Sequence, residues 1–195
     1  AQDITLSATG NQLADADARA LSVSGLASMG ATYATADAGG TVEAIMGGSV
    51  SGATGLNITA TSTNDADSKA ETTSAAFGAG IGGSVSTAKV TNDTQAGVGG
   101  ASVINMAGAV NINATSTSQG NAEAPNFAAG LAGIGLTTTN VDVGGSTSTF
   151  MDGTATQAAS ITAKTSATNT ADATSEATSA GIGSIGGAKT RAQVS

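Results

Sequence analysis

The side chains best able to do chemistry in this sequence are pairs of acidic residues close together in the chain. Two such pairs occur, Asp15 with Asp17 and Asp65 with Asp67, and Asp93 offers a further carboxylate beside the amide of Asn92. Their oxygen atoms are the ligands that calcium prefers, but neither the EF-hand loop nor the glycine-rich nonapeptide calcium repeat is present. Paired carboxylates also cleave glycosides, yet no aromatic platform for a sugar accompanies them. We therefore interpret these residues as a solvated acidic edge and assign no metal ligand.

Two segments match the glycine pattern G-x-G-x-x-G of dinucleotide-binding loops, at residues 78–83 and 181–186. A nucleotide loop requires a helix behind it, whereas the residues that follow the first segment, 84–90, alternate and are rich in β-branched side chains. The two matches also recur at equivalent places in a repeat. We therefore expect these glycines to allow close packing of sheets, and we assign no cofactor and no cofactor-binding residue.

Serine and lysine lie close in sequence at Ser68 with Lys69 and at Ser86 with Lys89. A serine nucleophile activated by lysine needs a third group to orient it, and the sequence offers none. Isolated serines and lysines are ordinary on an outward strand face. We assign no catalytic residue and expect a protein that is not an enzyme.

The composition excludes several classes of site. The chain has no Cys, His or Trp, so metal sites of the His/Cys type, disulfide frameworks and imidazole catalysis are absent. Six basic against fourteen acidic residues give a net charge of −8, which argues against nucleic acid as a partner.

The longest apolar run, residues 127–136, is shorter than the roughly 20 residues of a membrane span, so no transmembrane segment is expected. The first residues lack the features of a signal peptide, so targeting information is either removed or outside this chain.

Long stretches of the chain alternate between small or apolar residues and polar residues. After Ile58, for example, Ala60, Ala66 and Ala70 stand at even positions, with Thr, Asp, Lys or Glu at odd positions. Period two is typical of β-strands, and the helical spacing of three and four is missing. Because Ala171 and Ala173 follow the same rule, we predict that these alanines face a narrow interior.

The sequence is a repeat array. The phrase Gly-Gly, five residues, Met, one residue, Gly begins at Gly39, Gly99 and Gly144, and strand-like phrases carry isoleucines at 4, 58, 112 and 161. Such self-similarity indicates a solenoid, a propeller or another array. We treat residues 1–195 as one array with approximate repeats 4–57, 58–111, 112–160 and an incomplete 161–195.

Each repeat is predicted to contain about three strand-turn segments of roughly 18 residues, a plausible length for β-helix coils. Turn signals stand at Gly10-Asn11, Asn64-Asp65, Gly120-Asn121 and Asn169, and a second anchor at Gly25-Leu26, Gly80-Ile81, Gly130-Leu131 and Gly181-Ile182. The expected fold is all-β: a narrow parallel β-solenoid (β-helix) with an Ala/Gly/Ser interior and sheets closer than about 10 Å. One wide coil per repeat, with strands approaching twenty residues, and long antiparallel hairpins both remain open.

Residues 143–153, followed by the strand phrase 161–166 and by Ala-x-Ala and Ala-Gly-Ile-Gly segments, resemble the repeat regions of giant bacterial surface proteins of the filamentous-haemagglutinin and leukotoxin-like adhesin type. Those repeats combine a Val-Gly-Gly-Ser-Thr-like strand, an Asp-Gly turn and a Val-x-Ala-x-Ser strand. Asp152 keeps the turn aspartate, whereas Met46-Gly47-Gly48 and Met106-Ala107-Gly108 lack it. The resemblance implies a secreted, elongated, non-enzymatic filament or stalk at the bacterial surface.

The expected function is therefore that of a structural module of an extracellular adhesin or filament, used for attachment or matrix building. Its expected partner is more of the same array, joined end to end within one chain or between copies. The alternative is a ligand-binding solenoid of the ice-binding type, because threonines recur on outward positions: Thr59 with Thr61, Thr115 with Thr117, and Thr5 with Thr9. Only one coil per repeat would place such threonines side by side at about 4.8 Å.

Overall fold

The computed structural model describes residues 2–195 as eleven strands without a helix. Each repeat contributes two long strands, most of about twenty residues, and three of the four repeats add a short third strand. The strands are β1 (Ile4–Ser24), β2 (Ala27–Met46), β3 (Ser49–Ser51), β4 (Gly55–Ala76), β5 (Ala79–Val98), β6 (Val103–Asn105), β7 (Ala109–Ala129), β8 (Ala132–Met151), β9 (Thr154–Thr156), β10 (Ser160–Ala180) and β11 (Gly183–Val194).

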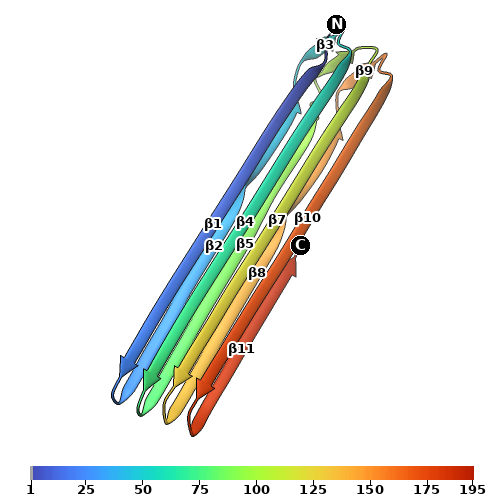
Figure 1. Ribbon diagram of the computed structural model, residues 1–195. Coiled ribbons are helices and arrows are strands. Elements are labelled where there is room, and N and C mark those ends of the chain that lie inside the picture. The colour runs from blue at the N-terminus through green and yellow to red at the C-terminus, as the bar shows by residue number, and fades with distance from the viewer. Residues whose placement is uncertain (1) are drawn as a thin grey trace.

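The strands form three parallel sheets, which confirms the predicted all-β parallel solenoid. The first sheet has the order β1-β4-β7-β10, the second β11-β8-β5-β2 and the third β3-β6-β9. Each coil runs along the first sheet, reverses in a tight turn and returns along the second sheet, and the first three coils close through the third. Figure 1 shows the result as a long, thin slab, with the tight turns in a line at one end and β3 and β9 at the other. We call these the turn end and the wide end.

Coil size differs from the favoured sequence interpretation. Each repeat forms one coil, so the wide-coil alternative is correct and the division into three 18-residue coil segments is wrong. The antiparallel-hairpin alternative is also wrong, because β1 and β2 follow one another but belong to different sheets and each pairs with the next coil. Alternation indicates which residues form strands but not how far each strand runs.

The register of the ladder also differs from the sequence anchors. Ile58 pairs with Leu6 and Ile112, whereas Ile4 pairs with Leu56 and Ile161 with Val110. Two of the four anchor isoleucines are therefore displaced by two residues, which keeps them on the same face of the sheet. Of the three Gly-Gly phrases, Gly39 and Gly144 share a row through Thr91, whereas Gly99 lies in the loop that leaves β5.

The predicted turn signals lie in the middle of strands. Gly10-Asn11, Asn64-Asp65, Gly120-Asn121 and Asn169 all fall inside the long strands of the first sheet. Several of these residues serve the interior instead. A Cβ atom on Gly10 would collide with Val42, and one on Gly120 would lie 2.8 Å from Val141 and Val143, so both glycines make room for a larger residue across the core. Asn64 is 1% exposed and points inward.

The composition of the core changes along the slab. At the wide end, large apolar side chains fill the space between the three sheets, including Leu56, Ile58, Ile104, Val110 and Ile112, all fully buried. The middle is filled by alanine and valine, and Ala66 and Ala70 are fully buried as predicted. Ala171 and Ala173 pack against the middle cluster from the outer strand, so their inward assignment is confirmed as well.

Toward the turn end the interior contains glycine and hydroxyl groups, and the two long sheets nearly touch. A Cβ atom on Gly133 would lie 2.8 Å from the carbonyl oxygen of Ala180 in the opposite sheet. Hydroxyl pairs bridge the gap, as between Ser28 Oγ and Ser74 Oγ at 2.8 Å. The predicted narrow Ala/Gly/Ser interior is therefore correct for this half of the slab, whereas the wide end has a conventional apolar core.

A buried polar layer separates the apolar core of the wide end from that of the middle. The side-chain nitrogen of Asn92 lies 2.6 Å from Ser62 Oγ, 2.9 Å from Thr94 Oγ1 and 3.1 Å from Ser116 Oγ. Ser62 Oγ and Thr94 Oγ1 also bond to each other across the gap, at 2.7 Å. Because these groups come from three strands of both long sheets, the layer fixes how the sheets sit against one another.

Candidate functional site

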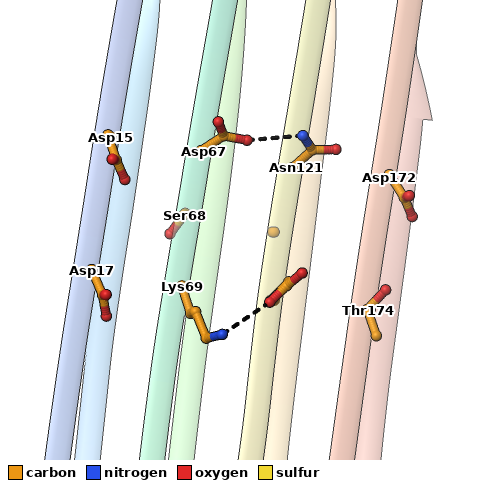
Figure 2. A pocket seen from close by; sticks show the side chains of 10 residues that line it. Asp15, Asp17, Asp67, Ser68, Lys69, Asn121, Asp172 and Thr174 are labelled. Carbon is orange, nitrogen blue, oxygen red and sulfur yellow. Dashed lines mark hydrogen bonds and ion pairs between the residues drawn. The ribbon is translucent and has the colours of Figure 1, made fainter.

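The polar side chains that could act on a ligand gather on the outward face of the first sheet. In-register stacking places Asp15, Asp67, Asn121 and Asp172 in one row, and Asp17, Lys69, Glu123 and Thr174 in the row two residues further along the strands. The two rows line a shallow depression of about 430 Å³, which we call the acidic groove (Figure 2). The structure thus brings Asp15 and Asp17 together with Asp67 of the second pair, whereas Asp65 does not line the groove.

Several charges in the acidic groove have a partner in the next coil or on the same strand. Asn121 Nδ2 donates a hydrogen bond to Asp67 Oδ1 at 2.8 Å, and Lys69 Nζ lies 3.4 Å from Glu123 Oε2 (Figure 2). Arg19 donates to Asp17, with Nη2 2.9 Å from Oδ2. Contacts between neighbouring coils support the ladder, although each exposed ion pair contributes little to stability.

Two carboxyl groups in or beside the groove titrate away from their ordinary range. The hydrogen bond from Arg19 lowers the pKa of Asp17. Asp65 lies in the adjacent row, and partial burial together with the negative charge of Asp67 raises its pKa. Asp65 Oδ1 is buried without a hydrogen-bond partner. The neighbours named in both shifts are two residues away on the same strand, and neither shift creates an acid and a base aimed at a common point.

The acidic residues considered as calcium ligands in the sequence do not assemble into a cage. Within residues 2–195, no group of three or more Asp or Glu side chains is arranged to hold a metal ion. Asp93 and Asn92 are adjacent on β5 and therefore point to opposite faces, with Asn92 buried and Asp93 exposed. Asp93 Oδ1 instead accepts a hydrogen bond from the backbone nitrogen of Ser146 in the next coil, at 3.1 Å.

The serine and lysine candidates are also separated by the sheets. Ser68 is buried in the core and Lys69 points outward to Glu123. Ser86 is buried too, and its hydroxyl donates to the carbonyl oxygen of Ser68 at 2.7 Å, whereas Lys89 is on the outward face of the same strand. Because each lysine points away from its serine, neither pair forms a Ser-Lys nucleophile.

Both glycine-rich segments cross a tight turn and continue into a strand, β5 or β11. Their inward glycines lie against the opposite sheet: a Cβ atom on Gly80 would lie 3.0 Å from the carbonyl oxygen of Ser74, and one on Gly186 3.0 Å from that of Ala177. The prediction that these glycines allow close sheet packing is confirmed. Phosphate binding at a helix N-terminus has no structural basis at these strands.

Threonines do stack on the first sheet, although not in the pairs that the sequence suggested. Thr9, Thr61 and Thr115 form one row, and Thr63, Thr117 and Thr168 form the next. Thr5 pairs with Asn57 and Thr59 pairs with Asn113, so Thr5 and Thr59 do not belong to the threonine rows. The two rows are adjacent and point outward, which gives a small flat field of hydroxyl and methyl groups.

Comparisons with protein-family models, with curated proteins and with solved structures find no match to this chain. The resemblance to adhesin repeats therefore stays a sequence-based expectation. Across residues 2–195 there is no helix long and apolar enough to cross a membrane.

Sequence reasoning missed one exposed cluster that is not polar. Large apolar side chains stand at the tight turns: Leu26, Phe77, Leu131 and Ile182. For Leu26, Leu131 and Ile182 the signal was present in the Gly-Leu and Gly-Ile anchors, which served only to mark the repeat, whereas Phe77 stands outside these anchors. Because large apolar residues that recur in a repeat are normally buried, this exposure was not expected.

Proposed function

We propose that this chain is a structural, non-enzymatic segment of a bacterial extracellular adhesin or filament, located at the cell surface or secreted. The observation that carries the proposal is the continuous parallel ladder, in which every long strand pairs with its equivalent in the next coil. Such a stack contacts only its nearest neighbours and grows by adding like units, which suits a filament.

The outward residues support the same interpretation. Asp17, Lys69, Glu123 and Asp67 are used in contacts along or between coils, and the candidate serines Ser68 and Ser86 are buried. A repeated surface of this kind suits a role that depends on surface area and stiffness.

We further propose that the array extends by self-association or by more of the same repeats. The outer strands β1 and β10 each pair with one neighbour in the first sheet, so their other edges present unpaired N–H and C=O groups. An unpaired strand of about twenty residues is a template for a further coil. That coil comes from the same polypeptide or from a second copy, joined end to end.

Electron microscopy and fibre diffraction of native material test this function. We expect ribbons about 70 Å wide, the length of a 21-residue strand, with a repeat of about 4.8 Å along the ribbon. Surface labelling of intact cells should detect the protein. Monodisperse particles without ribbons, or a protein found only inside the cell, would contradict the proposal.

A second candidate function is ice binding, favoured by the adjacent threonine rows of the first sheet. Strand spacing of about 4.8 Å and a two-residue step of about 6.6 Å would arrange their hydroxyl and methyl groups on a regular grid. Thermal hysteresis of the purified chain tests it, with Thr61→Lys and Thr117→Lys as variants. Hysteresis that disappears in both variants would favour this candidate over the structural one.

A further inference from the structure

The turn end of the slab carries a ridge of exposed apolar side chains. Leu26, Phe77, Leu131 and Ile182 are 84%, 81%, 53% and 91% exposed, respectively. Each stands at the tight turn of a different coil, and the turns lie in line at one end of the molecule (Figure 1). We call these four residues the apolar ridge.

Apolar side chains continue from the ridge onto both faces of the slab. On the first sheet Val23 and Phe127 are exposed. On the second sheet Met29, Ile81 and Ile185 are exposed, and the ladder places them in a single row that also includes Ile134. The exposed apolar surface therefore surrounds the turn end and is not confined to one face.

At the turn end polar residues face the interior and apolar residues face solvent, which is the reverse of the usual arrangement. The inward positions next to Met29 are Ser28 and Gly30, and Thr32 Oγ1 bonds to Thr72 Oγ1 across the gap at 2.6 Å. Hydroxyl groups and glycine thus face inward, while methionine, isoleucine and phenylalanine face outward. Exposed apolar clusters of this kind mark interaction sites.

The same region is free of charged side chains. No Asp, Glu, Lys or Arg occurs in the segments that pass through the turn end: residues 20–36, 72–88, 124–141 and 177–188. From the turn, these segments run about five residues along the first sheet and up to about ten along the second, or roughly 16 and 33 Å. In the first three coils charged residues begin only beyond those distances, whereas in the fourth coil Glu176 and Lys189 lie nearer the turn.

The turn backbone forms hydrogen bonds between coils. Gly78 N donates to Leu26 O, Ala132 N to Gly78 O, and Gly183 N to Leu131 O, each at 3.0 Å. A protein segment enters an apolar medium at low cost only if its backbone groups are paired internally. These bonds therefore reduce the cost of removing the turns from water.

We propose that the turn end inserts its apolar ridge into a lipid surface. A second copy is disfavoured as occupant, because it would cover one face and leave the other exposed. Four strands spaced about 4.8 Å apart, with charge-free lengths of about 16 and 33 Å, give areas of roughly 300 and 600 Å² for the two faces. A stable interface between two proteins buries about 800 Å² per partner, which is more than either face offers. Interfacial insertion reaches about 5–10 Å, which covers the ridge and its nearest apolar neighbours.

The negative charge of the chain determines which lipid headgroups it can approach. The chain has a net charge of −8, and its acidic residues lie beyond the charge-free region, so anionic headgroups would repel it. We therefore expect binding to zwitterionic phosphatidylcholine vesicles and weaker binding to vesicles that contain phosphatidylglycerol. Stronger binding to the anionic vesicles would contradict apolar insertion as the basis of binding.

Vesicle flotation tests the proposal with two matched threefold variants. One replaces the three most exposed residues of the apolar ridge: Leu26→Ser, Phe77→Ser and Ile182→Ser. The control replaces outward apolar residues far from the turn end: Leu13→Ser, Ile45→Ser and Val103→Ser. We expect the unchanged chain and the control to float with phosphatidylcholine vesicles and the ridge variant to lose at least about tenfold in binding. Failure of the unchanged chain to float, or equal flotation of a folded ridge variant, would overturn the proposal.

A single tryptophan provides a second measurement that does not depend on the folding of a threefold variant. The chain has no tryptophan, so Phe77→Trp introduces a unique reporter at the ridge and Leu13→Trp one far from it. Brominated phosphatidylcholine should quench the first and leave the second unchanged. Equal quenching of the two tryptophans would contradict lipid insertion. A dimer that depends on the ridge in ultracentrifugation, without any quenching by lipid, would also contradict it and would indicate a second copy as the occupant.

Discussion

Gly120 lies directly across the core from Val141, so that a Cβ atom on Gly120 would stand 2.8 Å from Val141 Cγ1. The pair shows how this interior is filled: a residue without a side chain on one sheet is matched by a branched one on the other. Where small and large residues face each other in this way, the gap between the sheets keeps its narrow width.

The first prediction concerns this pair. Gly120→Ala should overpack the core and lower the free energy of unfolding by about 1–3 kcal/mol. Gly83→Ala is the control, because nothing lies within 4 Å of a Cβ atom there, and it should be neutral or stabilise by up to about 1 kcal/mol. Denaturant unfolding measures both, and equal effects would show that the core does not restrict position 120.

The second prediction concerns the buried polar layer. Asn92→Ala removes the amide that contacts Ser62, Thr94 and Ser116, and should cost about 1–3 kcal/mol of unfolding free energy. Asn111→Ala removes a partly exposed amide bonded to Asn57 and should cost less. Thermal melts compare the two, and a larger loss for Asn111→Ala would contradict the structural role of the layer.

The third prediction concerns pH. The pKa of Asp65 is raised in the folded chain, so its protonated form is favoured by folding. Its contribution to stability is present below the unfolded pKa of about 3.9 and is lost as pH rises through the folded pKa. Asp65→Asn should therefore raise the melting temperature at pH 7 relative to the unchanged chain, with a smaller difference at pH 3. An equal difference at both values would show that ionisation of Asp65 does not matter.

The fourth prediction concerns like charges in the acidic groove. Asp15 and Asp67 are side by side in the ladder, so Asp15→Asn should stabilise the chain by about a few tenths of a kcal/mol at low salt, and the gain should shrink in about 1 M NaCl. Asp172→Asn is the matched control, because its partner in the row is the neutral Asn121. Equal gains in the two variants would indicate an effect of net charge alone.

Local alternation was sufficient to predict strands and faces. Ala66 and Asp67 were assigned to opposite faces from period two, and the structure places Ala66 in the core and Asp67 in the groove. This succeeds because a strand face depends only on neighbouring residues. Recurrence at equivalent places in the repeat predicted that the G-x-G-x-x-G glycines allow close sheet packing.

Coil length depends on contacts between distant residues and was not predictable in the same way. Asn64 is a typical turn residue, but its surroundings in β4 come from the coils above and below it. The Gly-Gly phrase at Gly99 matched in sequence but lies in the loop after β5, 8 residues (99 − 91) beyond Thr91, which pairs with Gly39 and Gly144. The apolar ridge was missed since exposure depends on where the chain reverses, which strand propensity does not encode.

The one-coil-per-repeat geometry stores a large amount of chain in a short distance. From Leu6 to its ladder partner Ile58 the chain advances 52 residues (58 − 6), yet the stack grows by only about 4.8 Å. Pulled out, such a coil would span roughly 170 Å. Under tension along the stack, each coil that detaches would lengthen the molecule by roughly thirty-five times its folded contribution. The array would therefore unfold coil by coil and absorb mechanical load before the covalent backbone is strained.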